Sequence, residues 1–102
     1  MKERIVCGVR AKVADTLWTR FIGLMGKADL ADGEGLLIED CNAIHTHFMR
    51  FAIDAVFLDA DERPVKIVRG IPPWKFCVCG GRNARKVLET KSRANPAAPD
   101  GV

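Results

Sequence analysis

Residues 41–59 hold the longest run of apolar side chains in the chain, and this run constrains the fold more than any other stretch. The run contains both histidines and three of the five phenylalanines. Residues 53–58 are apolar on both faces of an extended chain apart from Asp54, which predicts a central strand covered on both sides. A buried Asp54 carboxylate needs partners, and Arg50 or the backbone donors of the 49–51 turn are the expected ones.

Alternating apolar and polar residues predict further strands around this central one. Residues 4–13 are predicted as one strand with mainly the odd positions facing the core, so that Ile5 and Cys7 point inward. The central strand is expected to end in a hairpin turn at 59–64, after which residues 65–68 return antiparallel. The other candidate strands are 35–38, 43–49, 65–68, 75–79 and 85–90, the last of which is also compatible with a short helix.

One helix is predicted over about 16–25, capped by Asp15 or Thr16. The apolar residues of this helix recur at helical spacing and form one stripe, and Gly26 can adopt the left-handed conformation that often ends a helix. The stripe consists of Trp18, Phe21, Ile22 and Met25. The predicted class is therefore α+β: a compact, mainly antiparallel sheet or small barrel with one or two short helices packed on it.

The length of 102 residues predicts a single domain, which can bury one core without disulfides or a metal. We expect the globular part to span 1–93 and the Pro- and Ala-rich residues 94–102 to form a flexible tail. No apolar run approaches the roughly 18 residues of a membrane span, and charged residues interrupt the N-terminus where a signal peptide would be apolar. These features predict a cytoplasmic protein with no membrane association and with reduced thiols.

A zinc site is one hypothesis for the polar groups of the central run. His45 and His47 alternate along the predicted strand 43–49 and would point the same way, about 7 Å apart. Cys41 has the same parity, and Cys77 with Cys79 repeats the geometry on another strand. The structural alternative is favoured: His45 bonds a backbone group, His47 faces solvent and the cysteines pack. No nucleophile motif frames a cysteine, so no catalytic residue is predicted and the sequence leans against an enzyme.

Charge is distributed unevenly along the chain. Residues 63–93 contain nine Lys and Arg against Glu89 alone, a net charge of +8, whereas residues 1–62 have a net charge of −4. Such a skew can attract an anion or a nucleic acid. Only Trp74 and Phe76 lie among these basic residues, and a stacking platform for single strands needs more aromatic rings. A solvated surface is therefore the favoured interpretation of 63–93.

Several motifs in colinear order resemble a family of small bacterial and archaeal proteins. They are Thr16-x-x-x-Arg20-x-x-Gly23-Leu24-Met25-Gly26, Gly33-x-Gly35-Leu36-Leu37, Ile44-His45-Thr46-x-x-Met49-Arg50-Phe51-x-Ile53-Asp54-x-Val56-Phe57-Leu58-Asp59, Pro72-Pro73-Trp74 and Val87-Leu88-Glu89. Together they cover about residues 13–90 and are similar to domain-of-unknown-function family 192, in its Ile-His-Thr branch.

The resemblance implies a compact, mainly antiparallel β domain with a helix packed on it, and it assigns no activity. Many relatives carry a secretion signal. Two departures stand out. Residues 91–96 are unlike the closing turn, helix and strand of relatives, and His47 occupies a position where relatives more often have an aromatic or small residue.

The function predicted from the sequence is a non-enzymatic module that binds a small molecule or a protein. Pro72 and Pro73 exclude regular structure and hold the segment before Trp74 extended. This exposed segment is expected beside the central run. The predicted binding residues are His45, Met49, Arg50 and Trp74.

Overall fold

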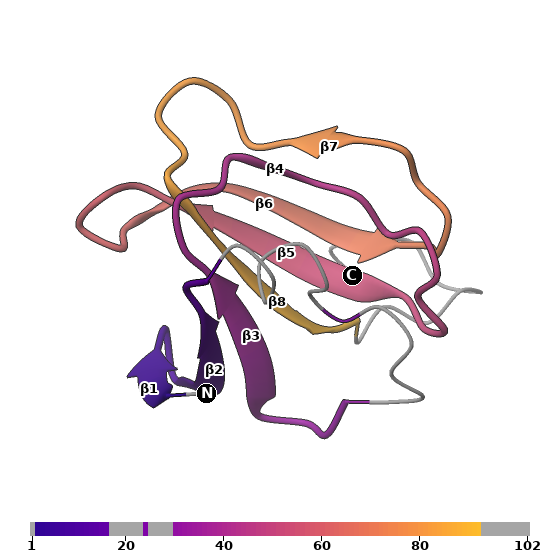
Figure 1. Ribbon diagram of the computed structural model, residues 1–102, viewed down its shortest axis with the longest axis horizontal. Helices are drawn as coiled ribbons and strands as arrows, with labels where there is room; N and C mark the ends of the chain where they lie inside the picture. The colour runs from indigo at the N-terminus through magenta and orange to yellow at the C-terminus, as the bar shows by residue number, and fades with distance from the viewer. Residues whose placement is uncertain (1, 17–23, 25–29, 93–102) are drawn as a thin grey trace.

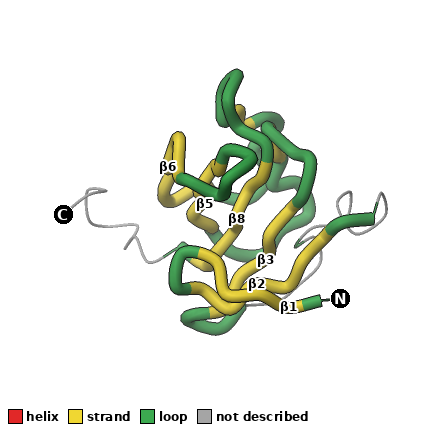
Figure 2. Tube along the Cα trace, turned by 90° about the vertical axis from the view of Figure 1, so that its left-hand side faces the viewer, coloured by secondary structure: helices red, strands yellow, loops and turns green. Residues whose placement is uncertain are grey.

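The computed structural model describes residues 2–16, 24 and 30–92, and every regular element in these ranges is a β-strand (Figure 1). Six strands form the main sheet in the order β1-β2-β3-β8-β5-β6 (Figure 2), and two short strands pair as a separate ribbon. All pairs are antiparallel except β2 with β3. The strands are β1 (Glu3–Val6), β2 (Val9–Ala14), β3 (Glu34–Ile38), β4 (Ala43–Ile44), β5 (Ile53–Leu58), β6 (Pro64–Ile71), β7 (Val78–Cys79) and β8 (Lys86–Lys91).

The prediction of an α+β class is wrong, because the described residues form an all-β fold without a helix. The mainly antiparallel sheet is confirmed. The predicted helix falls mostly on residues 17–23 and 25, which lie outside the described residues, as does the predicted tail. At 85–90 the alternative of a strand is the correct one: β8 pairs with β3 on one side and β5 on the other, so tertiary pairing decides where propensity does not. No helix capable of spanning a membrane is found in the described part of the chain.

The single strand predicted over 4–13 is also wrong, because the chain reverses at Cys7 and Gly8. Both residues have positive φ, 50° and 77°, and Val6 pairs with Val9. Two central residues with positive φ make the two-residue turn that matches the twist of a hairpin. The reversal changes which side chains face the core: Ile5 is 70% exposed and Cys7 is exposed.

Both faces of the main sheet carry apolar side chains. One face packs against the ribbon β4–β7 and its loops. The core between this face and the ribbon includes the buried residues Leu36, Ile44, Met49, Ile53, Phe57, Ile71 and Val87. The opposite face is lined by Val6, Ala11, Val13, Leu37, Leu58 and Leu88. Ile53, Phe57 and Leu58 of β5 are completely buried, which confirms the prediction of a central strand covered on both sides. The expected hairpin of β5 with its antiparallel successor is confirmed by β6.

An ion network fixes one end of the sheet. Glu62, in the β5–β6 turn, has a positive φ of 62° and hydrogen-bonds Arg4 of β1 and Lys86 of β8. Lys86 also pairs with Glu39, which follows β3. The network therefore joins β1 to the β5–β6 turn although 58 residues separate Arg4 from Glu62. The hydrogen bonds from Arg4 and Lys86 lower the pKa of Glu62 from 4.5 to about 2.

Acid titration tests this network. A carboxyl group whose pKa is lower in the folded than in the unfolded state stabilises the fold above its unfolded pKa, and this stabilisation is lost as the pH falls toward the folded pKa. For Glu62 the loss falls between about pH 5 and about pH 2. We expect the wild type to lose more unfolding free energy across this interval than Glu62→Gln does, measured by urea denaturation at several pH values. Parallel curves for the two proteins would contradict the assignment.

Candidate functional site

Two loops lie side by side at the right of Figure 1, and four aromatic side chains from these loops contact one another. His47 and Phe48 come from the loop 45–52 between β4 and β5, and Trp74 and Phe76 come from the loop 72–77 between β6 and β7. The ring centroids of Phe48 and Trp74 are 4.8 Å apart, and His47 lies 5.9 Å from both Trp74 and Phe76. Phe48, Trp74 and Phe76 are 58%, 60% and 82% exposed. We call these four residues the aromatic surface.

The buried Thr46 holds the two loops together. Its hydroxyl donates a hydrogen bond to the Pro72 carbonyl (2.7 Å) and accepts one from the Lys75 amide (2.8 Å). Its own amide donates to the Lys75 carbonyl (3.0 Å), and its carbonyl accepts from the amides of Trp74 (2.8 Å) and Met49 (3.2 Å). Every polar group of Thr46 is therefore used to fix the loops that carry the rings.

The backbone is strained at two members of the aromatic surface. Phe48 has a φ of 63° and Trp74 a φ of 69°. This left-handed conformation costs a residue with a Cβ atom about 1–2 kcal/mol. Bulky residues rarely adopt it, and strain of this kind is concentrated at functional sites. The exposed rings bury too little apolar surface to explain the strain as core packing.

The structure separates the four residues predicted to bind a ligand. Trp74 belongs to the aromatic surface, Arg50 is exposed on the same loop as Phe48, and His45 is half-buried with its ring 5.2 Å from that of His47. His45 Nδ1 accepts a hydrogen bond from the His47 amide (3.2 Å). Met49, however, is 5% exposed and packs in the core, so it cannot take part in the surface.

The five residues of the zinc hypothesis are only partly brought together. The two segments do adjoin, since Ala43 pairs with Cys79 in the ribbon β4–β7. The strand predicted over 43–49 ends at Ile44, however, because the loop then turns around Thr46. Cys41 Sγ lies 3.0 Å from the Ala43 carbonyl, while Cys77 and Cys79 are exposed. Across residues 2–16, 24 and 30–92, no three His, Cys, Asp or Glu side chains are grouped to hold a metal ion. The zinc site stays a prediction.

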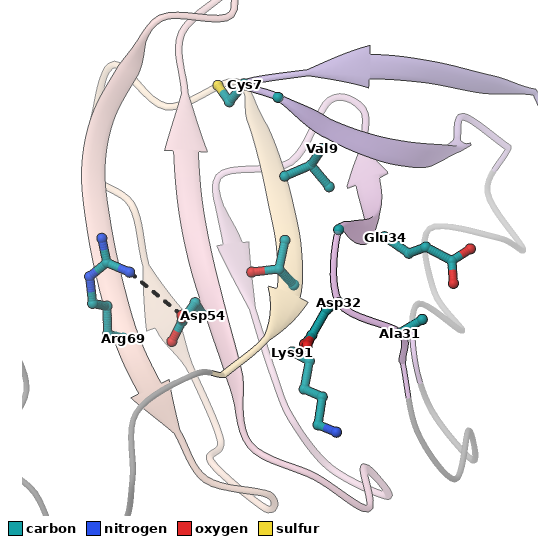
Figure 3. Close-up of a pocket in the computed structure, with 11 residues that line it drawn as sticks. Cys7, Val9, Ala31, Asp32, Glu34, Asp54, Arg69 and Lys91 are labelled. Atoms are coloured by element: carbon teal, nitrogen blue, oxygen red, sulfur yellow. Dashed lines mark ion pairs between the residues drawn. The ribbon is translucent and has the colours of Figure 1, made fainter.

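A cleft of about 340 Å³ lies at the other end of the sheet from the ion network (Figure 3). It runs from the Cys7–Gly8 turn past the end of β8 to Asp54 and Arg69. The Asp54 carboxylate accepts a hydrogen bond from the Gly70 amide (2.9 Å), and Arg69 Nη1 lies 3.6 Å from its second oxygen. Asp54 is thus paired as expected of a buried carboxylate, with Arg69 rather than Arg50. Its charge is balanced within the cleft wall.

Thr46, Phe48 and Phe76 were not among the site residues predicted from the sequence. Phe76 had a usable signal, since it follows Trp74 by two residues in a segment that the prolines keep irregular. Phe48 and Thr46 had none, because their roles arise from contacts with residues 26 or more positions away. Glu89 was also unassigned. It is 3% exposed on β8, opposite Leu36, and burial raises its pKa to about 8, so that its carboxyl group is mostly protonated at neutral pH.

Comparison with known families places the chain by sequence. The family model described as "DUF192: Uncharacterized ACR, COG1430" matches residues 3–96. A curated relative, the UPF0127 protein of Thermococcus sibiricus (strain DSM 12597 / MM 739), is 36% identical over 85 residues, which cover 79% of this chain and 54% of the relative. The chain therefore spans about half the length of that relative.

Two crystal structures share the fold. One is a protein of unknown function from Novosphingobium aromaticivorans DSM 12444, with a TM-score of 0.75 and 22% identity over 83% of this chain and 64% of that one. The other, from Sinorhizobium meliloti 1021, is described as a candidate transcription regulator and has a TM-score of 0.76 and 17% identity over 88% of this chain and 78% of that one. At these identities the similarity establishes the fold alone.

Proposed function

This chain belongs to the DUF192 family, whose description states no reaction, and we propose from its own site that it is a binding module whose ligand docks on the aromatic surface. The observation that carries the proposal is the combination of exposure and strain. Phe48 and Trp74 are both more than half exposed, and both have positive φ. Folding gains little from exposing these rings, and backbone strain at exposed aromatic residues supports a role in binding.

The two loops provide a preformed surface rather than a flexible one. Thr46 and the Trp74 amide fix the backbone on either side of the rings through the hydrogen bonds described above. A loop whose backbone is already fixed loses less conformational entropy when the ligand binds, which favours affinity. Exposed aromatic residues surrounded by polar ones are a frequent mark of binding surfaces. These features support recognition through ring stacking and apolar contact.

An environment-sensitive dye tests the proposal without knowledge of the natural ligand. The probe is 8-anilinonaphthalene-1-sulfonate, an aromatic sulfonate that fluoresces when bound to apolar surface. We expect the native protein to bind the dye and Trp74→Ala to lose most of this binding. The thermal midpoint should change little, because substitutions of exposed residues are usually within about 0.5 kcal/mol of neutral.

Ile67→Ala is the matched control. Ile67 is 50% exposed on β6, outside the two loops, and its truncation also removes partly exposed apolar surface. This variant should bind the dye as the wild type does. Equal loss of binding in both variants would contradict a specific site, and a collapse of the midpoint in Trp74→Ala would make that ring structural.

A further inference from the structure

We propose that the aromatic surface binds single-stranded nucleic acid, with unpaired bases stacked on Trp74, Phe76 and Phe48 and with phosphates held by Arg50 and Lys75. This inference rests on the proposed function and names its ligand. It follows from three features of the described residues: the open ring faces, the local charge and the way that the loops are joined.

The geometry of the rings suits bases better than it suits a core. The ring planes are tilted by 39° to 59° against their neighbours, so the contacting rings do not cover one another face to face. Phe76 is 82% exposed and Trp74 is 60% exposed. Every nucleobase has a flat face that can stack on such rings, and stacking of this kind is tolerant of sequence.

The fold supplies the aromatic rings that the sequence alone did not offer for stacking. Along the chain only Trp74 and Phe76 accompany the basic residues, which is too few for a stacking platform. The fold adds Phe48 and His47 from a separate loop, placing them within 4.8 to 5.9 Å of the first two rings. A surface with four rings has room for more than one base.

Charge selects an anion among the ligands that stack on aromatic rings. The segments 41–53 and 70–81, which include both loops, contain Arg50 and Lys75 but no Asp or Glu. Both cations are exposed. An oligosaccharide or a proline-rich peptide could use the rings but gains nothing from two cations. A strand of nucleotides alternates flat bases with phosphates and uses both kinds of group.

Fluorescence polarisation of a labelled oligonucleotide tests the proposal. The probe is a mixed-sequence single-stranded DNA of about 12 nucleotides, and an RNA of the same sequence is measured beside it. Controls are the duplex form, a strand of equal length without bases, and a mononucleotide. We expect the single strands to bind and all three controls to bind more weakly. In the duplex the bases are stacked on one another, the strand without bases has none to stack, and a mononucleotide occupies only part of the surface.

Two sets of variants separate stacking from charge. Phe76→Ala should weaken binding by at least about 5-fold, the lower end of what one stacked base contributes, and leave the salt dependence unchanged. Arg50→Ala with Lys75→Ala should instead flatten the salt dependence, since each phosphate contact contributes about 0.7 to the logarithmic slope for a single strand. Arg82→Ala, in the turn before β8, is the control cation and should leave both quantities unchanged.

Each other outcome overturns the inference in a recognisable way. Equal binding of the strand without bases would reduce the site to an anion site, and equal binding of the mononucleotide would make the ligand a free nucleotide. Sedimentation as a dimer that Trp74→Ala dissociates would mean that the aromatic surface pairs with a second copy of this chain. Dye binding without oligonucleotide binding would leave the proposed function intact and remove this ligand, whereas the absence of both would remove both proposals.

Discussion

Gly80→Ala should destabilise the protein by about 3 kcal/mol, at the upper end of the range for overpacking a core. A Cβ atom on Gly80 would lie 2.2 Å from Cδ1, 2.4 Å from Cγ and 2.8 Å from Cβ of Phe57. The Phe57 side chain is completely buried near the end of β5, within the packed core. Because Gly80 follows β7 directly, the substitution forces the ribbon β4–β7 away from the main sheet.

Urea denaturation measures this loss, and two variants make it specific. Gly81→Ala introduces a Cβ atom into open space but at a φ of 93°, so it should cost only the backbone strain, about 1 kcal/mol. Adding Phe57→Leu to Gly80→Ala should cost less than the sum of the single changes, because the smaller side chain yields space. Equal losses for Gly80→Ala and Gly81→Ala would show that the close approach to Phe57 is unimportant.

Thr46→Val should both destabilise the fold and weaken dye binding. Valine has the shape of threonine but leaves the Pro72 carbonyl and the Lys75 amide without their partner. A fully buried polar group left unpaired costs about 1–3 kcal/mol, and because Pro72 and Lys75 are exposed residues whose freed groups water can reach, we expect a loss at the lower end for the two, about 2 kcal/mol. The loop 72–77 then keeps only the two backbone hydrogen bonds to residue 46, so the rings of the aromatic surface are held less firmly together.

Thr46→Ser is the matched control for this substitution. Serine keeps the hydroxyl group that bonds Pro72 and Lys75, so the variant should retain dye binding with only the small cost of a lost methyl group. Thermal unfolding and dye titration on the same samples give both quantities. Thr46→Val with full dye binding would mean that Thr46 does not hold the surface together.

The sheet was largely accessible from sequence, whereas its turns were accessible only in part: the hairpin turn at 59–64 was predicted and the one at Cys7-Gly8 was not. The hydrophobic pattern predicts β5 because residues 53–58 are apolar at successive positions apart from Asp54, as expected of a strand buried on both faces. The first hairpin was missed because its turn is Cys7-Gly8 rather than Asn-Gly or Asp-Gly, so alternation continued across it without a break. For β8, local propensity does not distinguish a strand from a helix, and pairing on both sides decides.

The candidate site was only half accessible for a related reason. Trp74 was predicted because the prolines before it expose the segment locally. Phe48 joins it through the positive φ that both residues adopt and through the hydrogen bonds of Thr46, which connect positions 26 to 29 residues apart. Met49 was assigned to the surface on the assumption of a regular strand. The turn after Ile44 reverses that parity and buries it.

The most direct test of the aromatic surface is dye titration and thermal unfolding of Phe48→Gly beside Phe48→Ala. Both substitutions remove the ring, but only glycine relieves the strain at a φ of 63°. We predict that both variants lose dye binding and that the glycine variant is the more stable by about 0.5–1 kcal/mol, the strain relieved less the entropy that glycine loses on folding. A ring kept for binding at the expense of stability gives this result. Retained dye binding, or a glycine variant less stable than the alanine variant, would contradict the account.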